Sequence, residues 1–301
     1  MENRKLGNQK QIVSAYEMEI TSGTATGKKI LLVNNGAMEV MFNCDNALDI
    51  GWVKYHGQNI SFLSKNGFNS NVGPFREKFE GGFLYTCGLD NVSACEKDKA
   101  IHGSLHYRKA ENVSYQIDGK TITVKGTVYN TALFGDNLLL ERCYTVYPDK
   151  IEINDTIVNG GFNQTSFAVL YHINFGYPFL DTGMKLDFDQ IETIPANEKS
   201  KNTFKDCKVI TDPIDQGSED LFYQILKKGE VNLKNDNLGI SCKMEYDVNK
   251  LPYLVQWKNL ISGDYVLGIE PSTVRFDAYK KVNIDPQEKK TYNIALSFEK
   301  F

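Results

Sequence analysis

The chain has 301 residues, of which 41% are hydrophobic and 12% aromatic, with 24 glycines and 8 prolines. This composition predicts a folded protein with a large apolar core and excludes a disordered chain. A formal net charge of −4 and scattered lysines exclude the basic surface that nucleic acid requires. No apolar stretch has the length of a secretory signal or a membrane span. We therefore expect a cytoplasmic protein whose partners include neither nucleic acid nor membrane.

Short strand patterns follow one another along the whole chain. Alternating or continuous apolar segments predict strands at residues 30–33, 37–42, 82–86, 166–175, 254–257, 265–269 and 292–298. Three hairpins are expected, at 113–129 around a type I′ turn at Asp118-Gly119, at 138–158 around Pro148-Asp149, and at 231–246 around residues 235–237. Only residues 219–227 look helical, and the polar segment 181–220 is expected to form long surface loops over a site.

The order of these elements predicts an all-β fold, a large antiparallel β-sandwich. No Gly/Ser/Pro-rich linker and no internal repeat divides the chain, so we expect one domain over residues 1–301. Residues 1–28 are expected to be partly a peripheral N-terminal segment.

Cysteine spacing gives no indication of a metal site or a disulfide framework. The six cysteines lie far apart without a C-x-x-C pair, and we expect free thiols; they are Cys44, Cys87, Cys95, Cys143, Cys207 and Cys242. His102 and His106 could align on an extended chain as a metal pair, but no third ligand accompanies them. We therefore expect no metal and no cofactor.

Two of the four histidines stand in contexts that indicate chemistry. His172 lies on an aromatic strand, and the two-residue period places Asn174 on the same face. His102 precedes a glycine that lets a ligand come close. Glu270 ends an apolar strand, where desolvation disfavours a carboxylate that nothing uses. Taken singly, either histidine could be a structural one, and His56 is expected to be an exposed strand-end residue.

Three features in chain order carry a resemblance to the galactose mutarotase-like superfamily. They are Arg76 placed 26 positions before His102-Gly103, the strand Tyr171-His-Ile-Asn-Phe-Gly176, and the strand end Ile269-Glu-Pro-Ser272. The similarity extends from Lys29 to the end, and residues 79–91 resemble a bacterial branch of the superfamily. The resemblance implies a mutarotase-like supersandwich, aldose 1-epimerase activity and a monosaccharide or sugar derivative as partner.

The resemblance also assigns roles to single residues. It implies that Glu270 is the base and His172 the acid of ring opening, with His102 and Arg76 orienting the ring-oxygen side of the sugar. The family's sugar-binding aspartate has no clear match, and either Glu219 or Asp220 could fill that role.

Further residues complete the expected site. Asn174 is expected to bind substrate, and Trp257 could stack on a sugar ring or pack in the core. The sequence departs from the family pattern at Phe75, which replaces the asparagine before the arginine, and at Tyr171, which replaces the asparagine before the second histidine.

The expected activity is that of an isomerase that interconverts the anomers of a free sugar. The alternative is a non-catalytic carbohydrate-binding or sugar-sensing protein on the same fold. A third reading keeps the fold and uses the same carboxylate for sugar isomerisation or hydrolysis. The presence of both His172 and Glu270 favours an enzyme, because a binding protein would tolerate the loss of either. We expect a monomer or homodimer.

Overall fold

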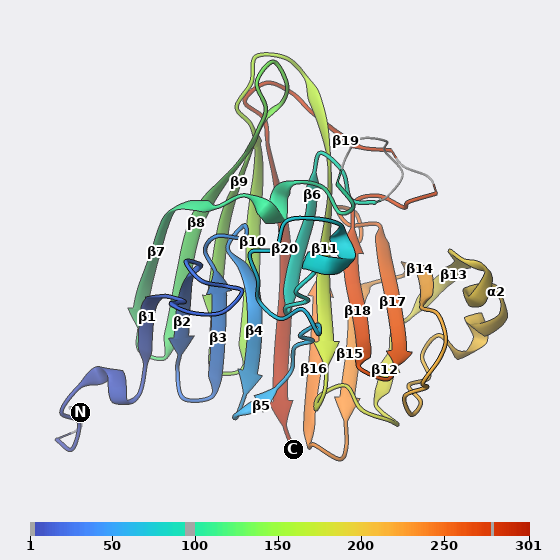
Figure 1. Cartoon of the computed structure of the whole chain (residues 1–301), viewed down its shortest axis with the longest axis horizontal. Helices are drawn as coiled ribbons and strands as arrows, with labels where there is room; N and C mark the ends of the chain where they lie inside the picture. Colours follow the sequence, from blue (N-terminus) through green and yellow to red (C-terminus); the bar gives the residue numbers. More distant parts are fainter. Residues whose placement is uncertain (1–3, 94–99, 278–279) are drawn as a thin grey trace.

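Two layers of antiparallel sheet make up the fold (Figure 1). The computed structural model describes residues 4–93, 100–277 and 280–301. In these ranges an eight-stranded sheet forms one layer, and a five-stranded and a seven-stranded sheet lie beside each other in front of it. Neighbouring strands pair antiparallel in all three sheets. The prediction of a large antiparallel β-sandwich is confirmed.

The strand orders are as follows. The five-stranded sheet runs β1 (Ser14–Glu19), β2 (Lys29–Asn34), β3 (Met38–Asn43), β4 (Asp49–Tyr55) and β5 (Gln58–Asn59). The eight-stranded sheet runs β12 (Lys185–Asp187), β15 (Gly229–Asn235), β16 (Ile240–Tyr246), β20 (Lys289–Lys300), β10 (Lys150–Asn159), β9 (Asn137–Val146), β8 (Thr121–Thr131) and β7 (Ala110–Asp118). The seven-stranded sheet runs β13 (Gln190–Pro195), β14 (Asp220–Leu226), β17 (Tyr253–Ile261), β18 (Asp264–Ser272), β11 (Thr165–Gly176) and β19 (Val282–Ile284), with β6 (Leu84–Leu89) also paired to β11.

Aromatic contacts join the eight-stranded sheet to both of its neighbours. The rings of Phe42 and Tyr144 lie 4.8 Å apart and connect it to the five-stranded sheet. Those of Phe167 and Tyr292 lie 6.1 Å apart and connect it to the seven-stranded sheet. All four side chains belong to one buried apolar cluster, so the main core lies between the two layers.

Strand β11 is buried on both faces, and its two-residue period separates two environments. Odd-numbered residues from Phe167 to Phe175 join the main core. Even-numbered residues, among them His172 and Asn174, face the other side of the sheet. A second apolar cluster that includes Phe62 and Phe79 covers that side. The expected placement of His172 and Asn174 on one face is confirmed, because the two side chains are hydrogen-bonded.

The three expected hairpins are present, with two corrections. In the third, Asn235 pairs with Ile240 at the end of β15, so the turn lies at residues 236–239 and not at 235–237. The other correction concerns the first hairpin. Strands β7 and β8 pair Asp118 with Thr121, so the loop consists of Gly119 and Lys120. The expected pair of positive φ angles at Asp118-Gly119 is wrong: within this turn only Gly119 has a positive φ, of 58°. Asp118 keeps its place in the ladder as the first residue of the turn and is not one of its two central residues.

Two predictions about the second half of the chain are also wrong. Residues 220–226 form strand β14 and no helix, because they pair with β13 on one side and β17 on the other. Segment 181–220 is not a set of plain loops, since it holds β12 and β13. The described helices are η1 (Gln9–Gln11), α1 (Phe75–Lys78), η2 (Leu105–Tyr107), α2 (Glu198–Thr203) and η3 (Phe204–Asp206). Within the described ranges, no helix is long and apolar enough to cross a membrane.

Candidate active site

His172 and Asn174 occupy the covered face of β11 and are almost completely buried. The Asn174 amide nitrogen donates to the backbone carbonyls of Gly82 at 3.0 Å and of His172 at 3.2 Å. The amide oxygen therefore accepts, and the Nδ1–H of His172 donates to it at 2.6 Å. This contact fixes the tautomer of His172 and leaves Nε2 free for chemistry. The Asn174 side chain, expected to bind substrate, is instead engaged by the protein itself.

Glu270 comes from β18, the strand next to β11. Its Oε1 lies 3.2 Å from Nε2 of His172, but without the alignment of a hydrogen bond. Among the described residues Oε1 has no hydrogen-bond partner, although it is buried. Gly268 leaves space for the carboxylate, because a Cβ at that position would lie 2.3 Å from Oε1. A buried acceptor without a partner is unusual in a folded protein and is suited to a ligand hydroxyl.

Burial favours the neutral forms of both groups. Desolvation raises the pKa of Glu270 well above its usual range, and the nearby Glu219 carboxylate raises it further. Desolvation lowers the pKa of His172 well below its usual range, and His102 acts in the same direction. Burial thus favours one transferable proton on Glu270 and an unprotonated Nε2 on His172.

His102 lies at the edge of the same site. Its ring centroid is 5.5 Å from that of His172, and its Nδ1–H donates to the carbonyl of Val92 at 3.2 Å. Burial lowers the pKa of His102 to about 4, so the ring is neutral near pH 7. Its Nε2 can then accept a hydrogen bond from a hydroxyl group but cannot supply a proton.

The structure separates the two acidic residues that the sequence left as alternatives. The indole N–H of Trp257 donates to Glu219 at 2.8 Å, and the Trp257 ring lies 5.3 Å from the His172 ring. Asp220 pairs in register with Lys258, whose side chain leaves β17 on the face opposite to Trp257. On that opposite face the Asp220 carboxylate accepts a hydrogen bond from the Thr203 hydroxyl at 2.7 Å. Glu219 therefore lies at the site, and Asp220 lies behind the sheet.

Arg76 is in α1, beside the site, with an exposed side chain. Its guanidinium makes no hydrogen bond or ion pair with any residue of the described ranges. The neighbours of Arg76 make the contacts instead: the ring of Phe75 lies 4.8 Å from that of His102, and the ring of Phe79 lies 5.8 Å from that of His172. From the sequence, Phe75 is only a departure from the family pattern and Phe79 has no role at the site, although their four-residue spacing, from the start of α1 to its C-cap, is a usable signal.

The remaining candidates fall outside the site. His106 does not point to His102, since its Nδ1 lies 2.7 Å from Asp49. In the described ranges, no group of three or more His, Cys, Asp or Glu side chains could hold a metal ion. His56 is exposed at the end of β4, as expected. Five cysteines are free thiols, and Cys95 lies outside the described residues.

The fold is that of the galactose mutarotase-like proteins. A Klebsiella pneumoniae protein provisionally assigned as an aldose 1-epimerase matches with a TM-score of 0.85 and 18% identity, over 95% of this chain and 83% of the other. A galactose mutarotase-like protein from Clostridium acetobutylicum matches with a TM-score of 0.72 and 16% identity, over 97% and 100%. A galactose 1-epimerase from Lactobacillus acidophilus matches with a TM-score of 0.68 and 13% identity, over 96% and 99%.

Sequence comparison places the chain more narrowly. The chain belongs to the family described as "Domain of unknown function (DUF4432)", whose model matches residues 25–297. No functionally curated protein matches the sequence.

Proposed function

We propose that the protein is an aldose 1-epimerase-like isomerase that interconverts the anomers of a free sugar. The observation that supports this most is the 3.2 Å distance between Nε2 of His172 and Oε1 of Glu270. The hydroxyl oxygen and the ring oxygen of a cyclic sugar are bonded to the same carbon, C1. Two acid/base atoms this close together can therefore face both oxygens at once.

The reaction transfers two protons and breaks one bond. Starting from a Glu270 carboxylate and a protonated His172, Glu270 takes the proton of the C1 hydroxyl while His172 gives its Nε2 proton to the ring oxygen. The bond between C1 and the ring oxygen breaks, and a carbonyl forms at C1. Rotation about the bond between C1 and C2 turns the carbonyl over. The two proton transfers then run in reverse, and the ring closes on the other face of C1. Ring opening leaves both side chains neutral, which is the state that burial favours.

Other residues bind and orient the sugar in this proposal. The neutral His102 accepts a hydrogen bond from a hydroxyl group near the ring oxygen. Trp257, held by Glu219, presents an indole surface beside His172 for the apolar face of the ring. Asn174 acts through His172 by holding its tautomer. Arg76 is placed at the entrance of the site in this proposal. A cytoplasmic location and a monomeric or dimeric state remain predictions.

A direct test uses the purified full chain and a panel of pure anomers, covering neutral, acidic, deoxy and phosphorylated monosaccharides. Proton NMR follows the approach to anomeric equilibrium with and without protein. We expect at least one sugar to equilibrate faster than in buffer. If a sugar binds but no anomer exchange is accelerated, the alternative of a non-catalytic sugar-binding protein is correct.

A further inference from the structure

A compact loop, residues 63–81, covers the candidate site, and we call it the cover. An isolated bridge between Leu63 and Gly81 closes its base. Besides the contacts of Phe75 and Phe79 with the two histidines, the Phe79 ring lies 6.2 Å from that of Trp257. His172 and Glu270 are only 5% and 2% exposed beneath it. A sugar cannot reach these two side chains unless the cover moves.

Hydrogen bonds inside the cover hold it together as one unit. Three asparagines on its first limb donate side-chain N–H groups to backbone carbonyls of its second limb. Asn66 donates to the carbonyls of Arg76 at 3.0 Å and Phe79 at 2.9 Å. Asn69 donates to the carbonyl of Lys78 at 3.3 Å, and Asn71 donates to that of Glu77 at 3.1 Å. Apart from Glu80, the cover is held by exposed contacts: hydrogen bonds of Thr24 with Phe68 and Ser70, and an ion pair of Lys65 with Asp264. Since the two limbs are tied to each other, the cover can move as a body once its outer contacts are broken.

The second limb ends in a buried carboxylate. Glu80 is 4% exposed and lies 3.0 Å from Nζ of Lys28, 3.0 Å from Nδ2 of Asn43 and 3.7 Å from Nε2 of His106. Immediately after it, Gly81 and Gly82 have φ angles of 77° and 90°, which turn the chain from the cover into the sheet. Glu80 thus joins the loop that carries Phe75 and Phe79 to Asn43 at the end of β3, to Lys28 just before β2 and to His106 in η2.

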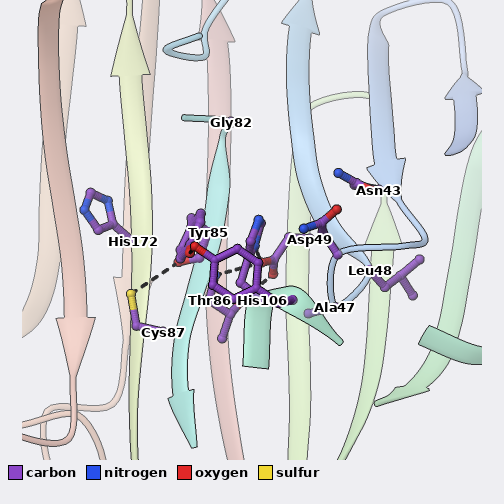
Figure 2. A network of polar contacts seen from close by, with 12 residues as sticks. Asn43, Ala47, Leu48, Asp49, Gly82, Tyr85, Thr86, Cys87, His106 and His172 are labelled. Atoms are coloured by element: carbon purple, nitrogen blue, oxygen red, sulfur yellow. Dashed lines mark hydrogen bonds and ion pairs between the residues drawn. The ribbon is translucent and has the colours of Figure 1, made fainter. Parts of the chain in front are cut away.

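The partners of Glu80 are themselves fixed. His106 is held by Asp49, whose carboxylate also accepts from Arg142 at 2.6 Å and from the Thr86 hydroxyl at 2.5 Å. Figure 2 shows Asn43, Asp49 and His106 on one side of Tyr85 and His172 on the other. The Tyr85 ring stacks on His106 at 3.6 Å and lies 5.4 Å from Phe79. The ionic cluster and the candidate site are therefore packed against one another.

Burying this many charges does little for stability, because desolvation offsets the attraction between them. Such clusters are better suited to fixing a geometry. We propose that Glu80 is a positioning residue that latches the cover in its closed position, so that Phe75 and Phe79 form the outer wall of the sugar site and sugar enters when the latch releases. This role deepens the function proposed above and rests on it, although the latch can be tested without any sugar.

The test compares Glu80→Gln with Glu152→Gln in the full chain. Glu152 is half-buried on β10 and pairs with Lys150, so it undergoes the same chemical change far from the cover. Both variants and the parent protein with which they are compared carry Trp52→Phe, which leaves Trp257 as the single tryptophan. The shared parent is needed because the Trp52 ring lies 5.6 Å from that of Phe68 in the cover. Hydrogen exchange measured by mass spectrometry follows peptides from residues 63–81, β11 and β18. Acrylamide quenching reports the exposure of Trp257.

We expect Glu80→Gln to accelerate amide exchange in residues 63–81 about tenfold, since a charged partner of a buried cluster is lost, and to increase the quenching of Trp257. Exchange in β11 and β18 should stay unchanged, and Glu152→Gln should change neither readout. Equal acceleration in the cover and both strands would mean a general loss of stability and would overturn the proposal. Unchanged exchange and quenching would overturn it as well.

Two further measurements complete the design. If Glu80→Gln does not fold, Lys28→Met takes its place. This variant removes the cation of the latch, keeps an apolar stem of similar length, and is judged by the same criteria.

Where a sugar substrate is found, a loosened cover should raise KM and change kcat less. Because exchange and quenching need no substrate, a failed latch and a failed epimerase assignment give different results.

Discussion

His172 Nε2 and Glu270 Oε1 lie 3.2 Å apart on neighbouring strands, and burial favours the uncharged form of both groups. A structural ion pair at this distance would hold a carboxylate and an imidazolium. Burial here favours the protonated carboxyl and the neutral ring instead. Reversible ring opening requires a pair with one transferable proton that either group can hold in turn.

Replacing Glu270 by Gln should lower the rate of anomer exchange by about 10²–10⁴-fold, because the amide keeps the size of the side chain but cannot accept the hydroxyl proton. Affinity for the sugar should stay within a few-fold. Proton NMR of pure anomers measures the exchange, and titration calorimetry measures the affinity. A thermal melt serves as the control for folding. A variant that changes affinity alone would support a binding protein.

Replacing His172 by Asn should reduce exchange by a comparable factor, since the variant keeps a polar side chain and loses the titratable nitrogen. The smaller side chain leaves a modest gap beside Trp257 and Phe79, so we expect a folded protein with a somewhat lower melting temperature. The double variant with Glu270→Gln should be little slower than either single variant, because the two groups act as one unit. Additive losses in the double variant would contradict this coupling.

The proximity of His172 and Glu270 could be predicted from the sequence. The position of the cover over the site could not. The two-residue period of β11 and the resemblance around Ile269-Glu270 both predicted residues that the structure places in contact. The cross-strand pair Arg142–Asp155 could have been found too, since the turn at Pro148-Asp149 sets the register of that hairpin.

The contacts of Glu80 join segments without a shared periodic pattern. Lys28 precedes β2, Glu80 ends a loop, and His106 lies in a single 3-10 turn. Their proximity depends on how the sheets pack, and no local rule predicts it. The same reason explains why the sequence could not choose between Glu219 and Asp220, because the start of β14 decides which side chain faces the site.

Replacing Glu219 by Gln should shift the pH dependence of exchange toward lower pH. The Glu219 carboxylate raises the pKa of Glu270, so its neutral replacement lets Glu270 ionise at a lower pH. The amide oxygen can still accept from the indole of Trp257, which preserves the packing. The measurement is the pH profile of kcat/KM for the best substrate. Asp220→Asn is the matched control and should leave the profile in place, and a shift in both variants would assign the effect to general electrostatics.

Replacing His106 by Gln should destabilise the protein more at pH 6 than at pH 9. Burial by itself would lower the pKa of His106, but the hydrogen bond from its ring to Asp49 and the nearby Glu80 carboxylate outweigh burial and raise it above the usual value of 6.5. The imidazolium contribution is therefore complete below about pH 6.5 and is lost as the pH rises through the folded-state pKa. Each unit of elevation is equivalent to about 1.4 kcal/mol.

The pH range of this comparison isolates His106. The pKa values of Asp49 and Glu80 are lowered in the wild type, and Arg142 and Lys28 still act in that direction when His106 is replaced, so we expect both carboxylates to stay ionised from pH 6 to pH 9 in both proteins. Any titration of Glu270 occurs in both proteins and cancels in the difference. Urea unfolding of wild type and His106→Gln at several pH values gives the difference in free energy of unfolding. A difference that stays constant or grows with rising pH would show that His106 is neutral in the folded protein, and the ion pair with Glu80 would have to be abandoned.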